Sequence, residues 1–387
     1  MNIHKKAVIM AVIAGNSIPF STSSANEVEL RRELLNLKHK VERLELSRKP
    51  LMSSEKPPLG WFNYLNLSGL VEVEAAYTDT PDTPDTPDTP DTHESDITLS
   101  KMELGIDAQV TPWVNAHGLI LFEEGVTDSP EIDEGIITLG NRDLSPFSMA
   151  VGRMYIPFGN FESYMVTDPL TQEIGETRET ALQAGYISDG FYSSLFLFNG
   201  DTKDGDSETI ELFGLNLGFV SDNETSGFSY DIGFSWINSL ADSDNLQESV
   251  TDPNNLAEKV PGFSIHAITR NGPFSLIGEY LTALKSFDVT DLAFNDTGAK
   301  SAAFNLEVGY AFELAGKDAS FAFAWQGTEE TLALDLPETR YLAALTMGIY
   351  KYTILGFEYA HDKDYGVSDG GSGDSSDTFT AQLTVVF

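Results

Sequence analysis

The chain has 387 residues, no cysteine, and a formal net charge of −37 from 60 acidic and 23 basic side chains. This charge excludes nucleic acid as a partner, because nucleic-acid binding needs a basic surface. The lack of cysteine excludes disulfides and thiolate metal sites. Past residue 50, only 14 basic residues stand against 55 acidic ones. These acids either solvate loops or form an acidic vestibule that concentrates cations.

Residues 1–25 have the pattern of a secretory signal peptide. Lys5 and Lys6 form a basic start, residues 7–15 are apolar, and residues 23–25 are small. The apolar run is too short to span a bilayer as a helix, and no later stretch reaches the roughly 18 to 20 apolar residues required. An exported membrane protein without helical spans crosses as a closed β-barrel, since only helices and closed barrels satisfy their backbone in lipid.

Residues 26–49 predict a short α-helical coiled coil. Leucine and valine recur at spacings of four and three, the heptad pattern of a coiled-coil seam. The seam residues are Leu30, Leu34, Leu37, Val41 and Leu44. Opposite charges such as Glu33 and Lys38 attract across a parallel interface, so we expect a periplasmic stalk that joins a homotrimer. The other interpretation is a single amphipathic helix lying on another surface. Prolines from Pro50 onward mark residues 50–64 as a linker.

Residues 65–387 predict an all-β fold, a transmembrane antiparallel β-barrel of about 16 strands. Apolar and polar side chains alternate through sixteen segments, and short turns alternate with long acidic loops, which is the barrel pattern. The segments are 65–77, 102–110, 114–123, 132–140, 147–156, 181–187, 191–198, 209–219, 228–236, 263–270, 274–283, 304–312, 321–326, 341–350, 353–361 and 379–387. A soluble β-sandwich would also alternate, but its turns would have similar lengths at both ends. A barrel of this size leaves an aqueous channel.

The first long loop, residues 78–96, contains a low-complexity repeat. Residues 80–92 read Thr-Pro-Asp four times and then Thr. Repeated proline favours an extended, solvated segment over packed structure. We expect a surface decoration without a binding role.

Alternation along the segments defines a lipid-facing set and a lumen-facing set. The last segment, Phe379–Phe387, is apolar on one face and polar on the other and ends in an aromatic residue, which resembles the final strand of bacterial outer-membrane barrels. We expect Leu67, Ile232 and Trp325, among others, to contact outer-membrane lipid. The residues expected to line the pore are Glu72, Glu74, Arg153, Asp231, His266, Arg270, Glu307 and Glu358. Among the arginines, alternation supports an inward position for Arg270 alone.

The sequence contains no recognisable catalytic or metal-binding pattern. The six histidines are scattered and do not form pairs at ligand spacing. There is no G-x-S-x-G nucleophile motif and no glycine loop with a lysine for phosphate. We therefore expect no enzyme activity, no bound metal and no cofactor.

Residues 157–180 predict the constriction of the channel. They join the fifth and sixth segments on the side of the long loops, and this third loop folds into the lumen of sixteen-stranded porins. A Pro-Phe-Gly run at its start turns the chain off the wall. The predicted constriction residues are Pro157, Phe158, Gly159, Asn160, Phe161, Asp168, Glu173, Glu176, Arg178 and Glu179.

The same region resembles the siderophore porins of the LbtU family, the legiobactin-receptor type. The residues that carry this resemblance are Gly152–Arg153, Pro157–Phe161, Asp168–Thr171, Gly175–Glu179 and Phe198–Asp201. The leader, the coiled coil and Phe387 fit the same family, so the resemblance covers nearly the whole chain.

The resemblance implies passive uptake of a ferric siderophore across the Gram-negative outer membrane. The linker of residues 50–64 leaves no room for a plug domain. Ferric carboxylate siderophores are anionic while this lumen is acidic, so Arg153, Arg178, Arg270 and Arg340 either form a basic path or pair with lumen acids. Two other functions remain open. One is a general diffusion porin with weak cation selectivity, and the other is a structural protein whose stalk ties the membrane to the cell wall.

Overall fold

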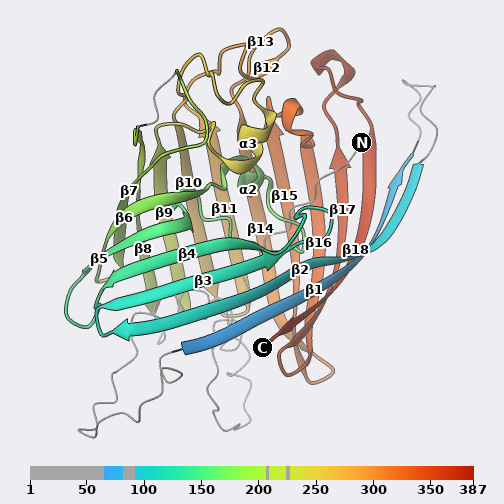
Figure 1. The fold of residues 1–387 in the computed structure, drawn as a ribbon. Coiled ribbons are helices and arrows are strands. Elements are labelled where there is room, and N and C mark those ends of the chain that lie inside the picture. Colours follow the sequence, from blue (N-terminus) through green and yellow to red (C-terminus); the bar gives the residue numbers. More distant parts are fainter. Residues whose placement is uncertain (1–64, 82–91, 206–208, 224–226) are drawn as a thin grey trace, which may run out of the picture.

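The computed structural model describes residues 65–81, 92–205, 209–223 and 227–387, which form a closed antiparallel β-barrel of sixteen strands (Figure 1). The expected barrel and its strand number are therefore confirmed. The predicted signal peptide, coiled coil and linker, and most of the Thr-Pro-Asp repeat, lie outside the described residues.

Each wall strand pairs with its neighbours along the chain, apart from a small two-stranded sheet inserted between β11 and β14. The first eight strands are β1 (Leu65–Thr80), β2 (Thr92–Thr111), β3 (Val114–Phe122), β4 (Glu131–Gly140), β5 (Phe147–Tyr155), β6 (Arg178–Ser188), β7 (Phe191–Phe198) and β8 (Leu212–Asn223). The other eight are β9 (Phe228–Ile237), β10 (Gly262–Asn271), β11 (Phe274–Ala283), β14 (Ala302–Leu314), β15 (Lys317–Glu329), β16 (Thr339–Tyr350), β17 (Thr353–Lys363) and β18 (Ser375–Val386).

The first and last strands close the barrel. β1 and β18 pair antiparallel from Leu70 opposite Val386 to Asp79 opposite Asp377. The C-terminal residue extends this ladder, because the Gly69 N–H donates to the Phe387 carbonyl at 2.8 Å and the Phe387 N–H donates to the Gly69 carbonyl at 3.0 Å. The Phe387 ring covers Gly69 so closely that a Cβ there would lie 2.4 Å from it.

A Gly69→Val substitution should therefore weaken the closure of the barrel. The added side chain would displace the Phe387 ring, and overpacking of this kind costs about 1–3 kcal/mol. Thermal unfolding followed by circular dichroism should show a lower transition temperature. Ala75→Val, on the same strand at an exposed position, is the matched control. An equal transition temperature for the two variants would contradict this role of Phe387.

The outer surface is apolar, as the alternation predicts. Leu67 is 64% exposed, Ile232 48% and Trp325 43%, which a soluble fold would not tolerate across so many strands. A barrel in lipid presents such a band to the acyl chains. No helix within the described ranges is long and apolar enough to cross a membrane.

The connections differ at the two ends of the barrel. At one end, tight turns such as residues 315–316 and 351–352 join the strands. At the other end, long loops carry α2 (Leu170–Gly175), α3 (Asp244–Ser249), β12 (Ala293–Phe294), β13 (Thr297–Gly298), η2 (Leu332–Leu334) and η3 (Val367–Asp369). Figure 1 shows α2 within the barrel, α3 above it, and β12 and β13 at the mouth.

Three of these loops build an apolar core at one side of the barrel. We call residues 156–177 L3, residues 238–261 L5 and residues 284–301 L6. Phe158 and Ile174 of L3, Leu246 of L5 and Phe287 of L6 are buried together with inward side chains of the strands, including Phe196. This core holds L3 inside the barrel, which is where the candidate site lies.

Candidate channel constriction

L3 leaves β5 and crosses the interior of the barrel before it returns to β6. Its start is fixed by Phe158, which is 1% exposed in the loop core. Gly159 follows with φ +82°, a conformation that favours glycine, and Phe161 has φ +55°. The Phe161 ring lies against both Gly159 and Gly175, since a Cβ on either glycine would meet it within 3 Å. The entry and the exit of L3 are thus packed around one ring.

Three wall glutamates hold L3 by accepting hydrogen bonds from its backbone. Glu279 of β11 accepts from the N–H groups of Asn160 and Phe161, at 2.8 and 3.1 Å. Glu307 of β14 accepts from the Tyr164 N–H at 2.9 Å and the Ser163 hydroxyl at 2.7 Å. Hydrogen bonds to charged groups are the stronger kind, at about 1.5–3 kcal/mol each.

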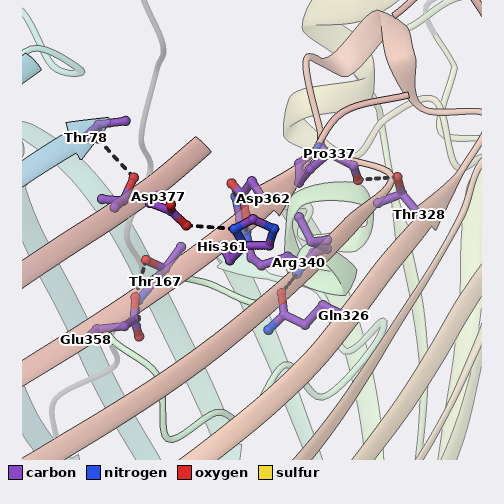
Figure 2. Close-up of polar contacts among 12 residues, drawn as sticks. Thr78, Thr167, Gln326, Thr328, Pro337, Arg340, Glu358, His361, Asp362 and Asp377 are labelled. Atoms are coloured by element: carbon purple, nitrogen blue, oxygen red, sulfur yellow. Dashed lines mark hydrogen bonds and ion pairs between the residues drawn. The ribbon is translucent and has the colours of Figure 1, made fainter. Parts of the chain in front are cut away.

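Glu358 of β17 is the third of these glutamates, and it holds the far end of L3. It accepts from the Val166 N–H at 2.6 Å and from the Thr167 hydroxyl at 2.6 Å, and Figure 2 shows Thr167 beside it. All three carboxylates are buried. They serve as fixed acceptors for a loop that lacks a strand neighbour.

Neutral and basic groups add further contacts to L3. The Gly159 N–H donates to the Ser235 hydroxyl at 2.9 Å, and the Leu170 N–H at the start of α2 donates to the Gln326 side-chain oxygen at 3.1 Å. The buried Asp168 lies within electrostatic reach of Lys101 on β2. L3 therefore touches the wall from β9 to β17 and faces β2 at its tip.

The returning arm of L3 is bound to L5. The Asn245 amide donates to the Glu173 carbonyl at 3.0 Å and to its carboxylate at 2.5 Å. The Asp244 N–H donates to the Glu176 carbonyl at 2.9 Å. The arm ends at Arg178, which opens β6, so the loop stops short of the predicted boundary at residue 180 and the predicted constriction residues Arg178 and Glu179 belong to the strand.

Glu176 is the titratable group of this arm that its surroundings shift most clearly. Burial and the neighbouring Asp244 carboxylate raise the pKa of Glu176 to about 8. The Gln172 amide donates to its carboxyl group at 2.8 Å. At neutral pH the contact between L3 and L5 is therefore made largely with a protonated acid.

The lumen arginines are paired with acids. Of the two interpretations given for them, a basic path or pairs with lumen acids, the structure therefore supports the second. Arg178 pairs with Asp133, and Arg270 pairs with Glu162 of L3. Arg340 forms a two-pronged pair with Asp362 at 2.8 and 2.9 Å (Figure 2). These arginines neutralise acids of the wall and of L3, and they do not form a free basic path.

Arg153 corrects the predicted pore lining. It is exposed and shares its face of β5 with the exposed Met149 and Val151, so alternation places it on the outer side of the strand. The residue lies beside Gly152, which has φ +140° and whose Cβ would fall 1.9 Å from the Gly135 carbonyl oxygen. Only glycine permits this close approach of β4 and β5.

The remaining predicted lumen residues point inward but are mostly covered. Glu72 has no exposed surface, and Asp231 and His266 are 5% and 4% exposed beneath L3. Asp231 accepts from the Tyr192 hydroxyl at 2.9 Å. Glu74 accepts from the Gln382 amide at 2.9 Å and stays partly exposed. The acids that the sequence placed in the lumen therefore serve chiefly to hold structure together.

Several functional residues escaped the sequence interpretation. Glu279 was one acid among sixty, although it is an inward acid between the apolar Ile277 and Leu281, which alternation alone could have revealed. Asp133 was missed because it lies at a β-bulge. Leu119 pairs with Glu134 and Ile120 pairs with Ile132, so Asp133 is the extra residue. A bulge cannot be located from alternation.

The interior of the barrel has a side that L3 covers and a side with accessible side chains. L3 occupies the side of β9–β17, while inward side chains of β2–β4 such as Asp107 and His117 keep 29% and 27% exposure. No group of three or more histidine or acidic side chains suited to a metal ion occurs among the described residues. The fold and its internal loop define a porin-type channel barrel.

By sequence, the chain is similar to UPF0422 proteins of two bacteria. No protein-family model matches the chain. It is 31% identical over 335 residues to a UPF0422 protein of Legionella pneumophila strain Lens, covering 76% of this chain and 62% of that protein. It is 29% identical over 341 residues to a UPF0422 protein of Coxiella burnetii strain RSA 493, covering 83% and 71%. The chain thus spans less than two thirds of its Legionella relatives.

Solved structures share the architecture at low sequence identity. OprB of Pseudomonas putida has a TM-score of 0.57 at 11% identity, covering 84% of this chain and 95% of its own. An anion-selective porin of Comamonas acidovorans has 0.55 at 14%, covering 84% and 99%. The outer-membrane channel DcaP of Acinetobacter baumannii has 0.53 at 14%, covering 84% and 97%. At such identities the likeness defines the fold alone.

Proposed function

We propose that this protein is a passive diffusion channel of the Gram-negative outer membrane for small hydrophilic solutes. The observation that carries this proposal is L3, held inside the barrel by Glu279, Glu307 and Glu358 while the inner wall of β2–β4 stays accessible. A loop anchored in this way narrows a channel without closing it. Selectivity then depends on the width and the charge of the remaining passage.

The membrane setting is part of the same proposal. The apolar outer surface faces lipid, and the tight turns lie on the side of the C-terminus (Figure 1), which is the periplasmic side in such barrels. The heptad seam of residues 26–49 supports a periplasmic coil that joins three copies. Cross-linking of the native protein, with and without residues 26–49, tests whether a trimer forms and depends on the coil.

Single-channel recording of the refolded protein in a planar bilayer tests the channel itself. Discrete open steps that persist at low voltage are expected, because an anchored loop leaves the passage open. A correctly folded barrel that adds no conductance above that of the bare bilayer would refute the proposal. Heat-dependent mobility on a denaturing gel verifies the fold in the same sample.

Ferric siderophore uptake is the second candidate function. It is favoured by the resemblance of Pro157–Phe161 and Asp168–Thr171 to the LbtU-family siderophore porins. Both segments lie in L3, where a passing ligand would contact the protein. Titrating a ferric siderophore into the recording should then give saturable block at micromolar concentration. Large steps that are indifferent to the siderophore would support a general porin and end the siderophore assignment.

A further inference from the structure

Two inner walls of the barrel differ in the acids that a solute can reach. On the side of β9–β17, Glu279, Glu307 and Glu358 are at most 5% exposed, because L3 lies over them and bonds to them. A carboxylate in that position accepts hydrogen bonds from the loop and has little contact with a passing ion. Charge selection therefore belongs to the other wall.

The wall of β2–β4 presents a column of accessible acids along the barrel. Asp107 stands opposite His117, Leu119 stands opposite Glu134, and one step higher Leu121 lies between Glu103 and Glu131. The side chains keep 29% exposure at Asp107, 12% at Glu134, 14% at Glu103 and 42% at Glu131. A solute that passes between L3 and this wall meets carboxylates at successive levels.

The cations on this wall are enclosed by acids. Lys101 is 1% exposed, with its Nζ 3.7 Å from Glu123 and 3.9 Å from Glu103. His117 lies between two carboxylates, with Nδ1 2.7 Å from Asp107 and Nε2 3.2 Å from Glu134. Because ionised carboxylates only accept hydrogen bonds, both ring nitrogens carry protons and the imidazole is a cation. It keeps 27% exposure, more than the 17% of Arg178 on β6, which pairs with Glu131 of this wall at 3.2 Å.

Glu72 completes the surroundings of Lys101. Glu72 on β1 stands opposite Lys101 in the register and has no exposed surface. One of its oxygens accepts from the Thr384 hydroxyl at 2.9 Å, while its Oε2 has no hydrogen-bond partner in the described part of the chain.

We propose that the inner wall of β2–β4 selects for cationic solutes and that His117 is the residue that sets the strength of this selection. The inference rests on the proposed channel function and adds the charge class of the solute. Small cations and organic ammonium ions gain from the exposed carboxylates, and dicarboxylates are repelled. The positive charge of His117 partly neutralises two of these carboxylates, so it limits the preference of the channel for cations.

The reversal potential of the full-length channel across a tenfold KCl gradient tests the proposal. The unmodified channel should prefer K⁺ to Cl⁻. His117→Gln should raise this preference by roughly twofold or more, because it removes the positive charge, and Asp107→Asn should lower it by a similar factor. Asp143→Asn removes an equal charge from an exposed turn and should leave the potential unchanged. Added 1,4-diaminobutane, a dication, should reduce the current more than added succinate, a dianion.

The opposite signs of the two substitutions make the result decisive. An anion-selective unmodified channel, or variants at His117 and Asp107 that shift the potential in the same direction, would overturn the inference while leaving the channel function intact. A folded barrel without any current would overturn the channel function and this inference with it. If His117→Gln fails to fold, His117→Asn replaces it, with a raised preference as the expected result.

Discussion

A Glu279→Ala variant should carry a larger and noisier single-channel current than the unmodified protein. Glu279 accepts four hydrogen bonds, two from the L3 backbone, one from the Ser264 hydroxyl at 2.8 Å and one from the Thr171 hydroxyl at 3.2 Å. Without the carboxylate, the N–H groups of Asn160 and Phe161 lose their acceptor, at about 1–3 kcal/mol for each buried group. L3 should then move away from the wall, with a conductance change on the order of twofold.

Glu74→Ala is the matched control for this prediction. Glu74 is also an inward wall glutamate, but it accepts from Gln382 on β18, and among the described residues it has no hydrogen bond to L3. Its removal changes the charge of the lumen by the same amount and leaves the loop anchored. Current noise that rises equally in both variants would mean that lumen charge, not loop anchoring, controls the passage.

Strands and their faces were predictable because alternation is a local property. Leu67, Ile232 and Trp325 need no knowledge of partners to be assigned outward, since a lipid-facing side chain has no specific contact to satisfy. The final strand ending in Phe387 was likewise predictable from the sequence, although the packing of the Phe387 ring over Gly69 was not. Sixteen segments with alternating turn lengths were enough to predict a closed barrel.

The interior was less predictable because its contacts join residues far apart in the chain. Glu307 and Glu358 were correctly placed on the inner face, but the sequence could not show that L3 covers them. They were therefore interpreted as residues that line the open pore, whereas in the structure they anchor L3. Arg153 shows the converse, because its basic charge suggested the lumen while alternation with Val151 places it outside.

Because these acids anchor L3 and do not line an open pore, other residues determine which charge of solute the channel favours. L3 bonds the predicted lumen acids Glu307 and Glu358, whereas Glu72 and Asp231 are buried against other strands. The arginines that would attract an anion are paired with Asp133, Glu162 and Asp362. The accessible acids that remain are the partly exposed Glu74 and the carboxylate column of β2–β4. The proposed cation selection predicts that a ferric complex using this passage is neutral or cationic, which restricts the siderophores that the second candidate function allows.

Raising the pH from 7 to 9 should loosen the contact between L3 and L5 through Glu176. The raised pKa of about 8 means that the folded protein keeps this proton between pH 4.5 and 8, where the unfolded chain has lost it. The contribution of Glu176 to the free energy of unfolding therefore falls as the pH rises through that window and stays constant above it. Above pH 8 the new carboxylate faces Asp244 of α3, Glu173 of α2 and Asp133 of β4, with Lys101 as the attracting charge.

Glu176→Gln isolates this effect, because other loop acids titrate as well. Burial also raises the pKa values of Asp242 and Asp291, so the pH dependence of the unmodified protein is a sum of several groups. The glutamine keeps an acceptor for the Gln172 amide and cannot ionise. Its thermal unfolding temperature should therefore fall less between pH 5 and pH 9 than that of the unmodified protein, and its current noise should not rise above pH 8. Parallel pH profiles for the two proteins would show that the contact between L3 and L5 does not depend on the Glu176 proton.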